Sequence, residues 1–327
     1  MKQILPLDPA TYQRHSIHGE NRTWAETNCY SDVIIELLHG LGHEPVAALP
    51  FTLAIDFEGD QWTFFKFPPA DLLELYGFDI QELAPWRPLV DHIEEQVGAG
   101  RPVLVELDSY YLPDTSGTAY RLAHVKSTVA VNEIDIGNLR LGYFHNQGYH
   151  VLENGDFIDI FQMEGLVHER MLPPYIEYVK KAPHFTPLSQ AALVEASRAL
   201  LGRHLGRIPE RNPFPAFKAK FQQDLDWLLT TDIDVFHAYS FVTLRQYGAC
   251  FELAGTCLGW LTAQGVDHLA PAQAAFDQIS QTTKAFQFQL ARSMARRKAI
   301  DLSPLDTMAE RWEEAMGGLV RQFGGTR

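Results

Sequence analysis

Cys29, His124 and Asn146 are residues whose types and order suit nucleophilic catalysis. Cys29 opens a stretch whose apolar residues recur at helical spacing, so we expect it at a helix N-terminus, where the helix dipole favours the thiolate. A thiolate nucleophile needs a histidine as general base and acid, and a polar group that orients the histidine. His124 begins one candidate strand and Asn146 ends the next, and antiparallel pairing of these strands would bring the two residues together. The sequence therefore predicts a Cys–His–Asn catalytic site.

Each of these residues also has a structural interpretation. A lone cysteine is commonly a small core residue, and a lone histidine is commonly a satisfied structural group. An asparagine after a strand commonly occupies a turn or a cap. Both interpretations stay open for Cys29, His124 and Asn146. Cys250 and Cys257 are seven residues apart on one predicted helix, so we interpret both as core packing.

Neighbouring polar residues offer further roles at the same site. His145 is a reserve orienter of His124, and Asp108, which interrupts an apolar strand, either orients the site or holds the following loop. Asn28 precedes Cys29, and its amide could donate a hydrogen bond to an oxyanion together with the backbone N–H of Cys29.

Weaker candidates for substrate binding are polar or aromatic residues near apolar surface: Gln61, Lys66, Tyr111, Arg245 and Glu252. Gln61 and Lys66 line either a substrate channel or the solvent-exposed face of a hairpin. Arg245 and Glu252 share a helix face and form either an ion pair or part of a site.

A local basic patch on this acidic chain consists of Arg292, Arg296, Arg297 and Lys298. The patch is either a solvated helix face or a dock for an acidic partner or a phosphate group.

Composition narrows the class of protein. The 327 residues carry a formal net charge of −14, which disfavours a nucleic-acid binder because phosphate neutralisation needs a basic surface. No window approaches 18 uninterrupted apolar residues, and the N-terminal apolar stretch is too short for a signal peptide, so we expect no membrane span and a cytoplasmic location. The three cysteines form no C-x-x-C pattern, which argues against a disulfide framework and a structural zinc site, and no metal is expected.

The expected secondary structure of the chain changes near residue 165. Before it, helical patterns (31–42, 69–77, 88–100) alternate with strand patterns (46–57, 62–67, 101–112, 124–135, 138–146). After it, the segments 188–205, 212–230, 236–265, 270–298 and 304–324 all have helical periodicity. We therefore predict an α+β domain over residues 1–165 and a mainly α-helical domain over residues 166–327.

Several segments carry a family resemblance. "WAETNCYSDVIIELLHGLGHEP", "FEGDQWTFFKFP", "GYFHNQGYHVL" and "FVTLRQYGACFELAGTCLGWL" resemble a bacterial family known only as a domain of unknown function, over nearly the whole chain. The arrangement "NCYSD … PVLVELDSYYLP … HVKSTVAV" is more distantly similar to the butirosin-biosynthesis acyltransferase family. That similarity implies a papain-like cysteine-protease-type fold, with Cys29 as nucleophile, His124 as base and Asp108 on the aspartate of a "D-x-Y-Y-L-P"-like segment. The family's third catalytic aspartate is replaced here by "FHN", and its "G-Y-D" by "VNEID".

The resemblance also implies an activity. Members of the acyltransferase family move an acyl group from the phosphopantetheine thioester of a carrier protein to an amine. Genes of the unknown-function family often neighbour ligases that load amino acids onto carrier proteins, which implies an aminoacyl cargo. We therefore expect a cysteine-dependent acyl- or aminoacyltransferase with no bound cofactor, an acidic carrier protein as partner and a small-molecule acceptor. The alternatives are a papain-like hydrolase (peptidase, amidase or thioesterase) and a non-catalytic module that binds a carrier protein.

Overall fold

The computed structural model describes residues 1–163 and 174–324, and its backbone contacts divide the chain into two compact units. The first, here called the sheet unit, comprises Met1–Gly19, Asn28–Pro45 and Pro69–Pro187. The second, here called the helical unit, comprises Glu20–Thr27, Val46–Pro68 and Leu188–Arg327. An α+β N-terminal part and a helical C-terminal part are thereby confirmed, although two short N-terminal pieces belong with the helices.

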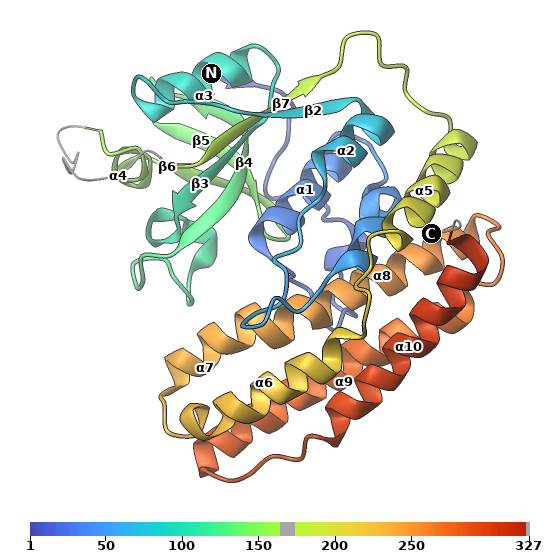
Figure 1. The fold of residues 1–327 in the computed structure, drawn as a ribbon. Helices are drawn as coiled ribbons and strands as arrows, with labels where there is room; N and C mark the ends of the chain where they lie inside the picture. The colour runs from blue at the N-terminus through green and yellow to red at the C-terminus, as the bar shows by residue number, and fades with distance from the viewer. Residues whose placement is uncertain (164–173, 325–327) are drawn as a thin grey trace. The chain divides into compact units, whose positions relative to one another are not determined.

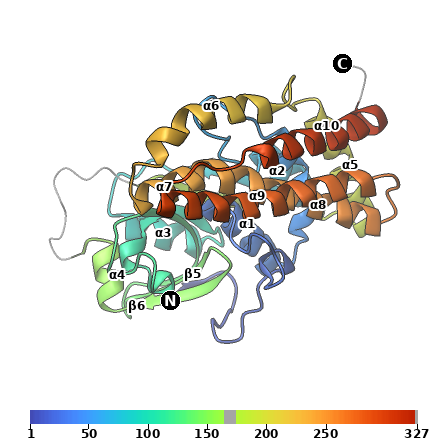
Figure 2. The ribbon, with the colours of Figure 1, turned by 90° about the horizontal axis from the view of Figure 1, so that it is seen from below.

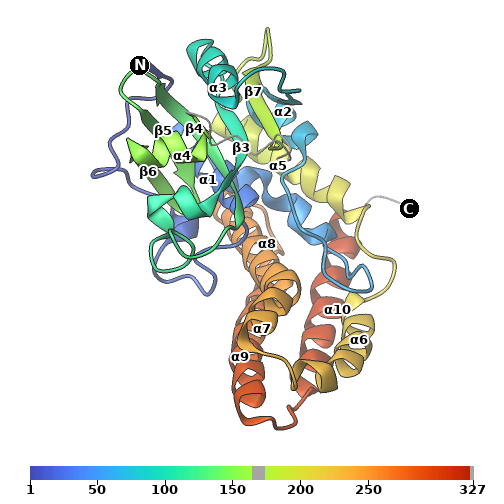
Figure 3. The same cartoon turned by 90° about the vertical axis from the view of Figure 1, so that its left-hand side faces the viewer.

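The sheet unit contains, within its described residues, one seven-stranded sheet whose strands pair antiparallel (Figure 1). The strands are β1 (Lys2–Gln3), β2 (Phe78–Glu82), β3 (Val103–Asp108), β4 (Lys126–Asp135), β5 (Arg140–His145), β6 (Gly148–Glu153) and β7 (Ile176–Lys181). Their order is β2-β7-β3-β4-β5-β6, with β1 paired to β4. Figure 3 shows β3 to β6 side by side. The expected antiparallel pairing of 124–135 with 138–146 is present as the β4–β5 hairpin, but the strands are shorter than expected, so His124 precedes β4 and Asn146 follows β5.

The boundary between the units falls at residues 187 and 188, whereas the sequence placed it at 165 and 166. Residue 165 itself lies outside the described residues. Strand β7 explains the difference, because it pairs with both β2 and β3 and so keeps the chain in the sheet as far as Lys181. The sequence around this strand is rich in proline, which masked its strand pattern.

The two faces of the sheet carry different layers, because side chains alternate along each strand. Odd-numbered residues of β3 and of β4 as far as Val131, and Ile134 beyond the register shift, join a hydrophobic cluster with α3 (Leu89–Gly98) and α4 (Gly155–Ile160). Even-numbered residues face α1 (Cys29–Gly40), since Cys29 contacts Thr128 and a Cβ on Gly40 would lie 2.8 Å from the Phe144 ring. We call this second surface the α1 face. The sheet unit also contains α2 (Pro69–Tyr76) and three short 3₁₀ helices, Ser16–His18, Ser109–Tyr111 and Pro113–Thr115.

The helical unit is built from long helices that pack side by side, as α8, α9 and α10 do in Figure 2. They are α5 (Gln190–Leu205), α6 (Pro213–Leu228), α7 (Ile233–Ser240), α8 (Gln246–Ala263), α9 (Ala270–Arg296) and α10 (Ser303–Phe323). A π-helical turn, Phe241–Arg245, joins α7 to α8. Each helical segment expected after residue 188 is present, which confirms the periodicity argument.

The segments 46–57 and 62–67, expected to be strands, differ in the structure. Residues Pro45–Ala54 form a 3₁₀ helix, and one isolated bridge, Phe57 to Trp62, is all that remains of the expected hairpin. The backbone N–H of Trp62 donates instead to the carbonyl of Val242 in the π-helical turn, at 3.1 Å. The Trp62 ring packs against Tyr247 with centroids 4.7 Å apart, so this tryptophan belongs to the core of the helical unit.

None of the helices in the described residues has the length and apolar character that crossing a membrane requires.

Candidate functional site

Cys29 is the first residue of α1, where the sequence placed it. Asn28 caps this helix: its backbone is extended, and its side-chain oxygen accepts a hydrogen bond from the N–H of Ser31 at 3.0 Å. The thiol donates to the hydroxyl oxygen of Thr128 on β4, with Sγ and Oγ1 3.8 Å apart. Cys29 is therefore a partly exposed thiol at the positive end of a capped helix, held over the α1 face of the sheet.

Cys250 and Cys257 are both buried in α8, which confirms their predicted packing role. Burial raises the pKa of both thiols. The Cys250 thiol donates to the carbonyl oxygen of Thr52 at 3.4 Å. Among the cysteines, only Cys29 combines exposure with a helix N-terminus.

His124 and Asp108 form a histidine–carboxylate pair. The Nδ1 atom of His124 lies 2.6 Å from Oδ2 of Asp108, the last residue of β3. The other carboxylate oxygen of Asp108 accepts the backbone N–H of Tyr110 at 3.0 Å, which fixes the carboxylate. The imidazole stacks on the Tyr110 ring at 4.3 Å and an interplanar angle of 11°, and its side chain is 66% exposed. The ring is thus oriented from one side and accessible from the other.

The sheet register relates this pair to Cys29. Glu106 lies opposite Thr128 and Asp108 opposite Lys126, so the carboxylate that holds His124 is one same-face position beyond the contact of Cys29. Same-face neighbours along a strand are about 7 Å apart. No hydrogen bond joins Cys29 to His124 in the described residues, and catalytic hydrogen bonds commonly tighten only when substrate binds.

Asn146, the expected orienter, lies elsewhere. It occupies the β5–β6 turn with φ 48°, and Asp108 makes the contact with His124 that was expected of Asn146. The register explains this, because Phe144 pairs with Ala130 and the strand turns away two residues later. By extrapolation Asn146 is level with Thr128, four residues or roughly 13 Å of extended chain short of His124.

His145, the reserve orienter, is buried on the sheet face opposite α1. Its Nδ1 lies 2.6 Å from Oδ2 of Asp114, and its Nε2 lies 2.6 Å from the hydroxyl of Ser127. Tyr143 donates to the other oxygen of Asp114 at 2.6 Å. The bonds from His145 and Tyr143 hold the pKa of the Asp114 carboxyl below its usual range, against a burial effect that raises it. This network ties the loop that carries Asp114 to β4 and β5 rather than to His124.

Carboxylates that the sequence argument missed line the α1 face beside Cys29. Tyr30, next to Cys29, donates to Glu177 of β7 at 3.1 Å, and Tyr175 donates to the same carboxylate at 2.8 Å. Burial, the bond to Glu177 and the nearby charges of Glu82 and Glu106 raise the pKa of Tyr175 to about 12. The sequence "VLVELD" (103–108) could have indicated one of these carboxylates. Glu106 and Asp108 are two residues apart on a strand, so their side chains lie on the same face of the sheet.

A second buried charged cluster holds the N-terminal segment on α1. His18 lies between Glu36, at 2.5 Å from Nδ1, and Asp32, at 3.2 Å from Nε2. Burial alone would lower the pKa of His18, but the bonds to both carboxylates raise it to about 9. Tyr12 also donates to Glu36, at 2.5 Å. The cluster secures the first two turns of the helix that begins with Cys29.

Arg245 and Glu252, expected to form an ion pair or to bind substrate, each hold the segment Glu20–Thr27 instead. Arg245 donates to the carbonyl of Thr27, and Glu252 accepts two backbone N–H groups of the segment. No ion pair joins Arg245 to Glu252 within residues 1–163 and 174–324.

The other weak candidates are divided between the two units. Tyr111 belongs to the sheet unit and meets the His124 ring edge-on at 6.2 Å. Gln61 and Lys66 belong to the helical unit, where the carbonyl of Gln61 accepts the N–H of Glu58 at 2.8 Å and the Lys66 ammonium lies 6.0 Å from the Phe64 ring. Their binding roles stay predictions.

The basic patch lies at the end of α9, with Arg292 and Arg296 on the helix, Arg297 at its C-cap and Lys298 beyond it. All four side chains are exposed, and Arg297 has φ 50°. The patch is therefore accessible to a partner, and its docking role stays a prediction.

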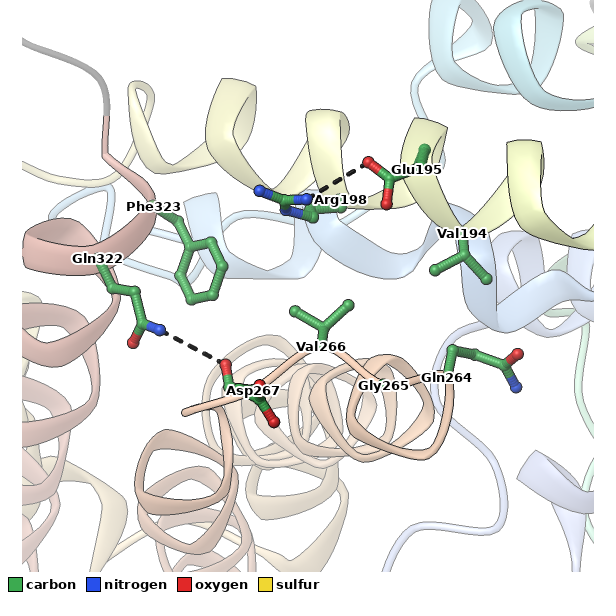
Figure 4. A pocket seen from close by; sticks show the side chains of 9 residues that line it. All are labelled: Val194, Glu195, Arg198, Gln264, Gly265, Val266, Asp267, Gln322 and Phe323. Carbon is green, nitrogen blue, oxygen red and sulfur yellow. Dashed lines mark hydrogen bonds and ion pairs between the residues drawn. The ribbon is translucent and has the colours of Figure 1, made fainter.

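A cavity of about 300 Å³ lies in the helical unit between α5, the α8–α9 loop and the end of α10 (Figure 4). It is lined by Val194, Glu195, Arg198, Gln264, Gly265, Val266, Asp267, Gln322 and Phe323. Arg198 pairs with Glu195 in its lining at 3.4 Å, and no predicted site residue lines it. In the part of the chain that the structure describes, no group of three or more His, Cys, Asp or Glu side chains is arranged to hold a metal ion.

The fold and site define a two-part protein, an antiparallel sheet unit with a cysteine at the start of its packed helix and a separate helical unit. The chain belongs to the DUF1839 family: the DUF1839 N-terminal domain matches residues 13–181, and the DUF1839 C-terminal domain matches residues 190–321. The predicted membership in a family of unknown function is confirmed. No curated protein matches the chain.

Proposed function

We propose that this protein is a papain-like, cysteine-dependent acyltransferase that takes an acyl or aminoacyl group from a carrier-protein thioester and passes it to an amine. The observation that carries the proposal is the placement of Cys29, at a capped helix N-terminus over β4, on the same sheet face as the His124–Asp108 pair. Papain-like enzymes place their cysteine on a helix and their histidine on the adjoining sheet. The distant similarity to carrier-dependent acyltransferases supplies the substrate class.

The chemistry follows from these groups. The Cys29 thiolate attacks the thioester carbonyl, the bond to the carrier sulfur breaks, and His124 gives its proton to the departing thiolate. An amine then attacks the acyl-enzyme while His124 accepts the amine proton, which forms the amide and releases the Cys29 thiolate. Asp108 keeps the imidazole in the required tautomer and stabilises the imidazolium. The N–H groups of the first turn of α1 and the Asn28 amide would stabilise the oxyanion.

The carboxylates of the α1 face favour an aminoacyl cargo. Glu106 and Glu177 lie on strands β3 and β7 beside the nucleophile, and their carboxyl oxygens are acceptors that a substrate ammonium could use. Glu106 pairs with the exposed Lys126 at 2.8 Å. A cargo with a free α-amino group therefore suits this face better than a carboxylate or phosphate. The basic patch at the end of α9 would then meet the acidic carrier protein.

The absence of a Cys29–His124 hydrogen bond in the described residues favours a second candidate, a non-catalytic module that binds a loaded carrier protein. This candidate uses the same surface but forms no acyl-enzyme.

A product assay separates these functions. Wild type and Cys29→Ala would be incubated with carrier proteins loaded with single amino acids, with and without an added amine. The transferase proposal expects amide product with wild type only, and loss of the aminoacyl group from the carrier. Free amino acid in place of amide would establish a hydrolase, and a carrier that stays loaded would favour the binding module.

A further inference from the structure

The residues just before Cys29 are held by the helical unit as if they were a bound peptide. Glu252 on α8 accepts the backbone N–H of Thr23 and the backbone N–H of Trp24, each at 2.9 Å. Arg22 adds an ion pair to Glu252 at 3.4 Å and donates to the Thr256 hydroxyl at 2.8 Å. One buried carboxylate therefore satisfies two consecutive backbone donors of a segment without regular structure.

Trp24 anchors the middle of this segment. It is 3% exposed, and its indole N–H donates to the Ser280 hydroxyl on α9 at 3.1 Å. The ring lies against Gly248, where an added Cβ would be 2.6 Å from Cζ2, and the Lys284 ammonium lies 4.1 Å from the ring centroid. A glycine on α8 and a cation on α9 thus form a close-fitting seat for one side chain.

Arg245 holds the last residue of the segment. It ends the π-helical turn Phe241–Arg245, and turns of this kind displace side chains around the helix axis and occur frequently at functional sites. Its Nε donates to the carbonyl of Thr27 at 2.9 Å, and its Nη2 lies 3.4 Å from the Glu26 carboxylate. The carbonyl of Thr27 belongs to the peptide group that continues into Asn28, the N-cap of α1.

We infer that Arg245 and Glu252 are positioning residues for the Cys29 nucleophile. By fixing the peptide group before Asn28, Arg245 holds the N-cap in the extended conformation that lets its side chain bond Ser31. The cap in turn orders the first-turn N–H groups that favour a Cys29 thiolate. Arg245 therefore acts on the nucleophile through the backbone that connects Thr27 to Asn28 and Cys29. This inference rests on the proposed nucleophilic role of Cys29.

The test is the rate of iodoacetamide alkylation of Cys29 as a function of pH, followed by peptide mass spectrometry on the full chain. We expect Arg245→Met and the isosteric Glu252→Gln to move the midpoint of the rate profile to higher pH and to slow alkylation at pH 7 about three- to tenfold. Arg245→Lys, which keeps a donor for the Thr27 carbonyl, would retain part of the rate. Arg311→Met, which removes a partly exposed pair with Glu314 within α10, is the matched control and leaves the profile unchanged.

Two results would overturn the inference, and they are distinguishable. Unchanged profiles in Arg245→Met and Glu252→Gln, with native thermal unfolding, would show that the contacts of Arg245 and Glu252 with the segment Glu20–Thr27 do not act on Cys29. A wild-type Cys29 that reacts no faster than free cysteine would instead remove the proposed nucleophile, and the positioning role with it.

Discussion

The imidazole of His124 and the carboxylate of Asp108 are joined by a 2.6 Å contact between Nδ1 and Oδ2, at the end of β3 nearest the Cys29–Thr128 contact. The contact leaves Nε2 of His124 as the ring nitrogen that can exchange protons with a substrate. Asp108 is itself fixed by the N–H of Tyr110. The group that contacts His124 in this candidate site is therefore a carboxylate from a neighbouring strand.

Asp108→Asn is predicted to lower kcat about 10²- to 10⁴-fold, because the amide neither holds the same tautomer nor stabilises the imidazolium. The measurement is steady-state transfer of an aminoacyl group from a loaded carrier protein. Asn146→Gly, which tolerates the positive φ of that turn, is expected to leave kcat within about twofold. The opposite pattern, with loss in Asn146→Gly and none in Asp108→Asn, would restore Asn146 as the orienter.

The stability of the sheet unit is predicted to fall as pH rises from about 6.5 to about 9. The bonds to Asp32 and Glu36 outweigh burial and raise the pKa of His18 to about 9, so protonated His18 stabilises the fold fully below its unfolded pKa, and the contribution is lost as pH passes the folded value. The expected loss is on the order of 3 kcal/mol at most.

Urea unfolding of wild type and His18→Gln at several pH values measures this contribution. The difference between the two free energies of unfolding should be largest near pH 6 and should shrink toward pH 9.5. A difference that stays constant over this range would show that His18 does not carry the predicted proton.

Gly248→Ala is predicted to destabilise the helical unit by about 1–3 kcal/mol, the usual cost of overpacking a filled core. The new methyl would lie 2.6 Å from the buried Trp24 ring and 2.9 Å from Thr283 Cγ2. Gly318→Ala on α10 meets nothing within 4 Å and is the control, with an expected gain of about 0.5–1 kcal/mol from helix propensity. Equal unfolding midpoints for the two variants would contradict the close seat of Trp24.

Native protein is predicted to expose one fast-reacting thiol. Cys250 and Cys257 are buried, and burial raises the pKa of both thiols, whereas Cys29 is partly exposed. Thiol titration should count one group in buffer and three in urea. Rapid labelling of Cys250 or Cys257 in the folded protein would contradict the packing of α8.

The helical periodicity of the chain predicted most of its helices well, because they have an apolar stripe that the sequence displays directly, whereas α8 is buried on all sides. The strand that follows Tyr175 and the packing of Trp62 were not predictable in this way. β7 follows prolines that usually interrupt strands, and Trp62 and its aromatic neighbours belong to the core of the helical unit, which only tertiary packing reveals.

The residue types of the candidate site were predictable from the sequence, but most of their hydrogen-bond partners were not. Cys29 and His124 are identified by their element positions, but the choice between Asp108 and Asn146 depends on the strand register, which the sequence does not display. Arg245 and Glu252 share a helix face and suggested a mutual ion pair. Their actual partners lie more than 200 residues away in the sequence, in the segment before Cys29.

The most direct test of the central claim is intact-protein mass spectrometry of wild type, Cys29→Ala and His124→Gln after brief exposure to aminoacyl-loaded carrier proteins. The account predicts that wild type gains the mass of one aminoacyl group on the peptide containing Cys29, that Cys29→Ala gains nothing, and that His124→Gln gains it more slowly. A wild-type protein that remains unmodified with every carrier, while Cys29 alkylates no faster than free cysteine, would contradict the nucleophilic role of Cys29.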